Sequence, residues 1–109
     1  MFRFHWDDWN LDHATRHGVS TIDAEFLVQT TPQERFEQAA DEKFRVVGRT
    51  DAGELIQVVF ALKTFEDLDY EALSIADIIE LEVYQQPLVY VIHSRPLTVS
   101  EKRRFNRRR

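Results

Sequence analysis

Cysteine is absent from this chain of 109 residues. This absence excludes a disulfide framework and any cysteine-based metal site, and it leaves the redox compartment open. No apolar run approaches the roughly 18 residues that a membrane span requires. The first residues, Met1 to Trp6, alternate aromatic and polar side chains and so lack the basic and then apolar pattern of a signal peptide. These absences predict a cytoplasmic protein without a membrane contact.

Apolar residues are plentiful enough for one small core. They make up 43% of the chain and include eight phenylalanines and two tryptophans. A core of this size can form in a single small domain without cross-links. Because there is no internal repeat, low-complexity region or linker, we expect residues 1–109 to form one domain.

Net positive charge is also lacking, since the chain carries −5 at pH 7. The charge is unevenly distributed: the last eight residues include six Lys or Arg, whereas Phe65 to Glu82 contains seven acids and no base. Local potential steers a charged partner more than the total does. The basic end therefore predicts a phosphate-binding surface, with complementation of a helix C-terminus as the alternative for Arg107 to Arg109.

Hydrophobic periodicity and capping residues predict an α+β fold. In the first forty residues we expect a strand, two helices and a short third helix: Phe2–Trp6, Asp7 or Asp8 to Gly18, a helix opened by Ser20 to Asp23, and Pro32–Ala40.

The rest of the chain predicts mainly strands. Lys43–Thr50 and Leu55–Leu62 should form a hairpin, and Leu88–Ser94 a further strand. Thr98 and Glu101 form a capping box for a final helix from about Val99. An acidic insert, residues 63–87, lies between the strands Leu55–Leu62 and Leu88–Ser94. For this insert a helix capped by Ser74 and Asp77 and running to about Glu82 is favoured over a strand at Ile78–Tyr84.

Five short motifs in order are similar to the BrnT family of bacterial toxins. They cover about 80 residues, nearly everything except the insert, and are Phe-x-Trp-Asp (Phe4, Trp6, Asp7), Arg-His-Gly-Val (Arg16 to Val19), Glu-Lys-Phe (Glu42 to Phe44), Gly-Arg-Thr (Gly48 to Thr50) and Arg-x-x-Thr-x-x-Glu (Arg95, Thr98, Glu101).

The resemblance implies a RelE-like small antiparallel sheet with N-terminal helices and a C-terminal helix. It also implies a metal-independent endoribonuclease that needs no cofactor, acts on RNA, and is neutralised by a BrnA-like antitoxin that binds DNA. The alternative is a catalytically inactive protein-binding module of the same fold.

Cleavage by 2′-hydroxyl attack requires cations that stabilise the charge developing on the phosphate oxygens. Arginine suits this task because its planar fork grips two oxygens and stays charged. Arg49 should end a hairpin strand and Arg95 the last strand, so that both can reach one phosphate. The alternative is a pair of surface arginines that meet acids of the insert.

Proton transfer has three candidates: His17, His93 and Glu101. Histidine titrates nearest to neutral pH. His17 ends the first helix, where it can alternatively hydrogen-bond a last-turn carbonyl, and Glu101 can alternatively serve only the capping box with Thr98. Further substrate-binding candidates are the polar and cationic residues Arg16, Lys43, Thr98, Lys102 and Arg103.

Two other readings of the sequence compete with these. His13 and His17 have a spacing that can hold a divalent ion, but no third ligand lies near, so we expect no metal site. The aromatic residues of the strands could stack on bases, but their alternation favours the core: Phe2, Phe4, Trp6, Phe44 and Phe60.

The acidic insert is a candidate internal competitor that occupies the cationic groove in place of RNA.

Overall fold

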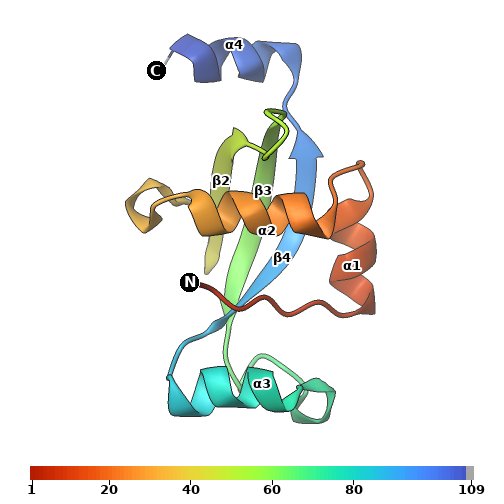
Figure 1. The fold of residues 1–109 in the computed structure, drawn as a ribbon, viewed down its shortest axis with the longest axis vertical. Helices are drawn as coiled ribbons and strands as arrows, with labels where there is room; N and C mark the ends of the chain where they lie inside the picture. Colours follow the sequence, from red (N-terminus) through yellow and green to blue (C-terminus); the bar gives the residue numbers. More distant parts are fainter. Residues whose placement is uncertain (108–109) are drawn as a thin grey trace.

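The computed structural model describes residues 1–107, so that Arg108 and Arg109 of the predicted basic end lie outside the described residues. The described residues form four α-helices and one antiparallel sheet of order β1-β2-β3-β4 (Figure 1). The expected α+β class, with N-terminal helices and a C-terminal helix, is confirmed. In chain order the helices and strands are α1 (Asp8–Thr15), α2 (Thr21–Thr30), β1 (Glu37–Ala40), β2 (Lys43–Arg49), β3 (Leu55–Lys63), α3 (Ile75–Ile78), β4 (Leu88–Pro96) and α4 (Val99–Arg107).

The core lies between the sheet and α2, which crosses one face of the sheet in Figure 1. Val46 of β2 pairs with Val58 of β3, and both are buried with Leu27 of α2. The approach is close at Gly48, where an added Cβ would lie 2.7 Å from Leu27 Cδ1. The predicted hairpin of β2 and β3 is confirmed, and its turn places Gly53 at φ +88°.

The N-terminal segment is extended but is not the strand predicted for Phe2–Trp6. Its only ladder contact among the described residues is one parallel bridge between Phe4 and Val89. His5 N donates to Val89 O, and Val89 N donates to Arg3 O, each at 2.9 Å. The pairing stops there because Asp7 caps α1, which turns the chain away. The predicted packing of the alternate aromatic residues against the core is confirmed.

The short helix predicted for Pro32–Ala40 is wrong. A single 3-10 turn, η1 (Gln33–Arg35), is followed by β1, which pairs with β2. The turn between β1 and β2 places Glu42 at φ +59°. Asn or Gly normally marks such a position, so no local residue pattern predicts this hairpin.

The acidic insert contains the predicted capped helix. Ser74 and Asp77 complete a capping box for α3, which continues into a π-helical turn, η3 (Ile79–Val83). The insert joins β3 to β4 at one end of the sheet, while α4 follows β4 at the other end (Figure 1). The insert therefore cannot occupy a groove beside α4, and the internal-competitor hypothesis is wrong.

Candidate active site

Three arginines share the sheet face that points away from α2. Side chains alternate along a strand, so Arg45 and Arg49 point opposite to the buried Val46. Gln57 pairs with Val47 of β2 on one side and with Arg95 of β4 on the other. Paired residues share a face, and we call Arg45, Arg49, Gln57 and Arg95 the arginine face.

Gln57 links two of these arginines directly. Its Oε1 atom accepts hydrogen bonds from Arg45 Nη1 at 3.1 Å and from Arg95 Nη2 at 3.5 Å. The Gln57 residue is 7% exposed, so the guanidinium groups cover it. The sequence predictions missed Arg45 and Gln57. The alternation of Arg45, Val47 and Arg49 along one strand could have predicted that Arg45 shares a face with Arg49.

Arg49 and Arg95 lie on one face, but they do not share a partner. Their backbones are two strand spacings and two residues apart, roughly 12 Å. Arg49 Nη1 donates to Gly53 O at 3.0 Å, and its Nη2 lies 3.5 Å from Asn106 Oδ1 of α4. The neighbour that shares an acceptor with Arg95 is instead Arg45.

Arg95 is held by Glu101 in a two-pronged ion pair. Its Nη1 and Nη2 atoms donate to Glu101 Oε1 and Oε2 at 2.7 and 2.8 Å. Glu101 Oε1 also accepts from Thr98 N, and Thr98 Oγ1 accepts from Glu101 N, so the predicted capping box is confirmed. The Arg95 hydrogen bond, with the Thr98 amide, holds the pKa of Glu101 well below its usual range. Such a carboxylate is a poor proton acceptor.

A hollow of about 990 Å³ opens beside the arginine face at the edge of β2. Its lining includes Arg45, Arg49 and Gln57 from the sheet and Arg104 and Phe105 from α4. The edge is available because β1 pairs with β2 only as far as Arg45. The hollow adjoins the arginine face, and its charged lining is mixed: Glu37 pairs with Arg45 at 2.8 Å, and the other charged residues are Glu34, Glu101, Arg35, Arg49 and Arg104.

The two candidate histidines meet at the other side of the arginine face. The His17 ring lies edge-on to His93, with their centroids 5.2 Å apart. His17 follows α1, whereas His93 is two residues from Arg95 on the same face of β4. Burial, then His17 and Arg95, lower the pKa of His93, which favours a neutral, proton-accepting imidazole at neutral pH. The histidine pair lies outside the hollow itself.

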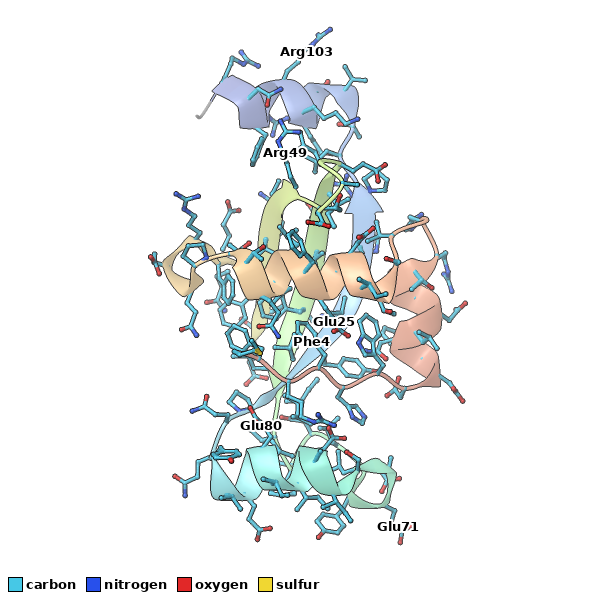
Figure 2. All side chains as sticks on the ribbon, viewed as in Figure 1. Phe4, Glu25, Arg49, Glu71, Glu80 and Arg103 are labelled. Carbon is cyan, nitrogen blue, oxygen red and sulfur yellow. The ribbon has the colours of Figure 1, made fainter. Side chains whose placement is uncertain are left out.

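The remaining predicted substrate-binding residues are dispersed. Arg16 is paired with Asp12 at 2.7 Å. Lys43 is exposed at the start of β2, on the same sheet face as Arg45 and two residues from it, but six residues and so roughly 20 Å from Arg49. Lys102 and Arg103 are exposed on α4, and Figure 2 shows Arg103 pointing outward.

The His13 and His17 pair forms no metal site among the described residues. Within residues 1–107 no three His, Asp or Glu side chains lie close enough to hold an ion together. His13 instead stacks on Trp9, with centroids 3.8 Å apart, and its Nδ1 bonds Trp9 O at 2.7 Å. Within the same residues no helix is long and apolar enough to cross a membrane.

Comparisons with protein-family models, curated proteins and solved structures gave no match. The resemblance to BrnT toxins therefore depends on the short motifs alone.

Proposed function

We propose that this protein is a metal-independent endoribonuclease of the toxin type. The observation that carries the proposal is the meeting of His17 and His93 beside Arg95, on the same open face as Arg45 and Arg49. These five side chains supply a proton acceptor, a proton donor and three cations. They come from the turn after α1, from β2 and from β4, so only the folded sheet brings them together.

In the proposed reaction the RNA 2′-oxygen attacks the adjacent phosphorus. His93 accepts the 2′-hydroxyl proton as the new P–O bond forms, and His17 donates a proton to the 5′-oxygen as its bond to phosphorus breaks. The products are a 2′,3′-cyclic phosphate and a 5′-hydroxyl. The arginines stabilise the additional negative charge on the phosphate oxygens in the transition state.

Glu101 has a positioning role in this scheme. Because its carboxylate stays ionised and is bonded to Arg95, it fixes the guanidinium instead of moving a proton. A phosphate entering the site would compete with Glu101 for the same fork. Thr98 contributes indirectly, since its hydroxyl closes the cap that places Glu101.

The test is cleavage of a labelled RNA in the presence of a chelator, with the products analysed for cyclic phosphate ends. His93→Gln should lower the rate at least 100-fold, which is the usual contribution of a general base. His13→Gln is the matched control, because His13 lies outside the site and should leave the rate unchanged. The rate should fall as pH drops through the lowered pKa of His93, since the protonated imidazole cannot accept.

Cleavage that survives His93→Gln, or that requires an added divalent ion, would contradict this mechanism. A tight complex with a protein partner and no cleavage of any RNA would favour the second candidate, a catalytically inactive protein-binding module. The observation in favour of that alternative is that Arg95 already has a two-pronged carboxylate partner. We propose an antitoxin-like protein partner in either case, and co-purification from a two-gene expression would test it.

A further inference from the structure

Half of the large apolar side chains that are exposed in residues 1–107 lie between residues 70 and 84. Three of them are on α3 and η3, and a fourth, Tyr84, directly follows η3: Ile75 is 79% exposed, Ile79 41%, Val83 68% and Tyr84 64%. Such a concentration on one short segment is unusual, because isolated exposed apolar residues are normally scattered.

Helix geometry aligns these side chains on the outer side of the insert. Ile75 and Ile79 are one α-helical turn apart. The next turn is closed by a bond from Tyr84 N to Ile79 O, an i to i+5 spacing that adds a residue to the turn. The wider turn cancels the drift of an α-helix and returns Val83 to the line of Ile75. Asp77 and Leu81, on the inner side, are buried.

The inner side of the insert is hydrogen-bonded to the rest of the domain. The outer side is therefore already ordered before any partner binds. Asp77 Oδ1 accepts from Arg3 Nε at 2.6 Å, and its Oδ2 from His5 Nδ1 at 3.3 Å. These bonds join the insert to the N-terminal segment beside β4. A partner that docks on Ile75, Ile79 and Val83 would therefore not have to order the helix first.

Charge identifies the kind of partner. Within residues 1–107, Asp77 is the only one of the seven acids between residues 65 and 82 that has an ion-pair partner. Glu71 and Glu82 are exposed, and Figure 2 shows Glu71 at the outer tip of this end of the molecule. An apolar stripe with unpaired acids beside it complements an apolar stripe that has Lys or Arg beside it.

We propose that Ile75, Ile79, Val83 and Tyr84 form a docking surface for a cationic amphipathic helix of a partner protein. A straight stripe one residue wide per turn fits the i, i+4 apolar ridge of a second helix. A second copy fits poorly, because symmetric pairing of this surface would oppose its acids. The basic α4 of another copy exposes only Val99 as a large apolar side chain among its described residues.

The probe is a synthetic helical peptide of about 18 residues, long enough to be partly helical alone, with leucines along one face and lysines elsewhere. Binding is measured by fluorescence anisotropy against a second peptide in which glutamate replaces every lysine. Ile75→Ser should weaken binding of the cationic peptide about fivefold, and Ile75→Ser with Val83→Ser at least tenfold. Ile22→Ser is the matched control, since Ile22 is 76% exposed on α2.

Equal binding of both peptides, equal loss in the Ile22 variant, or no binding of the cationic peptide at about 1 mM would overturn the proposal. The remaining alternative is that a second copy of the protein covers this surface, and sedimentation of the protein alone tests it. If the wild type is dimeric and Ile75→Ser with Val83→Ser is monomeric, the occupant is a second copy and the proposal is wrong. All these outcomes are independent of RNA cleavage, because the docking surface lies on the insert, at the end of the sheet opposite α4 (Figure 1).

Discussion

Replacing Asp77 with alanine should destabilise the protein far more than replacing Asp12. Each aspartate forms an ion pair with an arginine at nearly the same distance: 2.6 Å from Asp77 to Arg3 and 2.7 Å from Asp12 to Arg16. The surroundings differ, because the Asp77 side chain is 7% exposed and the Asp12 side chain 67%. The comparison therefore separates the effect of burial from that of distance.

The expected magnitude follows from the donors that Asp77 satisfies. Its loss leaves the buried Nδ1 of His5 without an acceptor, which costs about 1–2 kcal/mol. The bond from Ser74 N is half of the capping box of α3 and contributes about 0.5–1 kcal/mol. Arg3 is 40% exposed and can be rehydrated, so its share is at most about 1 kcal/mol. The sum is about 3 kcal/mol, and an exposed helix pair such as that of Asp12 should contribute a small fraction of it.

Urea denaturation followed by circular dichroism gives the free energy of unfolding of each variant. Asp77→Asn is the intermediate case, because it keeps an acceptor for Ser74 N but lacks the charge that attracts Arg3. Equal destabilisation by Asp77→Ala and Asp12→Ala would refute the reasoning. It would mean that the insert is not held by its buried carboxylate.

The contribution of the Asp77–Arg3 ion pair to stability should depend on pH. Burial acts to raise the pKa of Asp77, but the hydrogen bonds from Arg3 and Ser74 outweigh it and lower that pKa. A lowered folded pKa means that the stabilisation is present above the unfolded value of about 3.9 and is lost as pH falls through the folded value. The gap in stability between the wild type and Asp77→Asn should therefore shrink below about pH 4. A gap that stays constant down to pH 2.5 would contradict the assignment of the charge to this pair.

Three further changes test the packing and the site. Gly48→Ala should cost about 1–3 kcal/mol in urea denaturation, because its Cβ would overlap Leu27 Cδ1. Ser94→Ala should be neutral or stabilising by up to about 1 kcal/mol, since the buried Ser94 hydroxyl has no hydrogen-bond partner among residues 1–107. Glu101→Gln should release Arg95 and make RNA binding more salt-dependent, raising the slope of log K against log salt by about 0.7.

The last of these needs a control for net charge alone. Glu71→Gln makes the same change of charge at the insert, and Glu101 belongs to α4 at the opposite end of the molecule (Figures 1 and 2). Near physiological ionic strength its salt slope should equal that of the wild type. If both variants change the slope equally, RNA responds to the total charge and the arginine face has no special part in binding.

Sequence predicted the elements that depend on local chemistry. The capping boxes at Ser74 and Thr98 and the apolar run of β3 are each contained within a few residues, and each is found where expected. The predictions that failed concern residues whose structure depends on contacts with distant parts of the chain. Thr31 and Pro32 resemble a helix start, but residues Glu37–Ala40 gain more from pairing with β2, a contact that no local pattern announces.

For the candidate site, too, local features were predicted and contacts between distant residues were not. The strand pattern predicted Arg49 at the end of β2 and Arg95 near the end of β4, and the family resemblance drew attention to both. It did not show that Gln57 would connect Arg95 to Arg45, because that depends on the register across three strands. Nor did it show that Glu101 would hold Arg95 in a two-pronged pair, which depends on the direction in which α4 leaves β4.

The distribution of charge along the molecule explains how an acidic protein can still present a surface for anions. The structure is 43 Å long, with the acidic insert at one end and the basic α4 at the other. The Debye length at physiological salt is about 8 Å, so exposed charges at the two ends are screened from each other. A phosphate that approaches Arg49 therefore responds to the arginine face, and the acids of the insert remain available to attract a cationic partner. At low salt this separation weakens, so the effect of Glu71→Gln on RNA binding should emerge only at about 10 mM ionic strength, where the Debye length grows to roughly 30 Å.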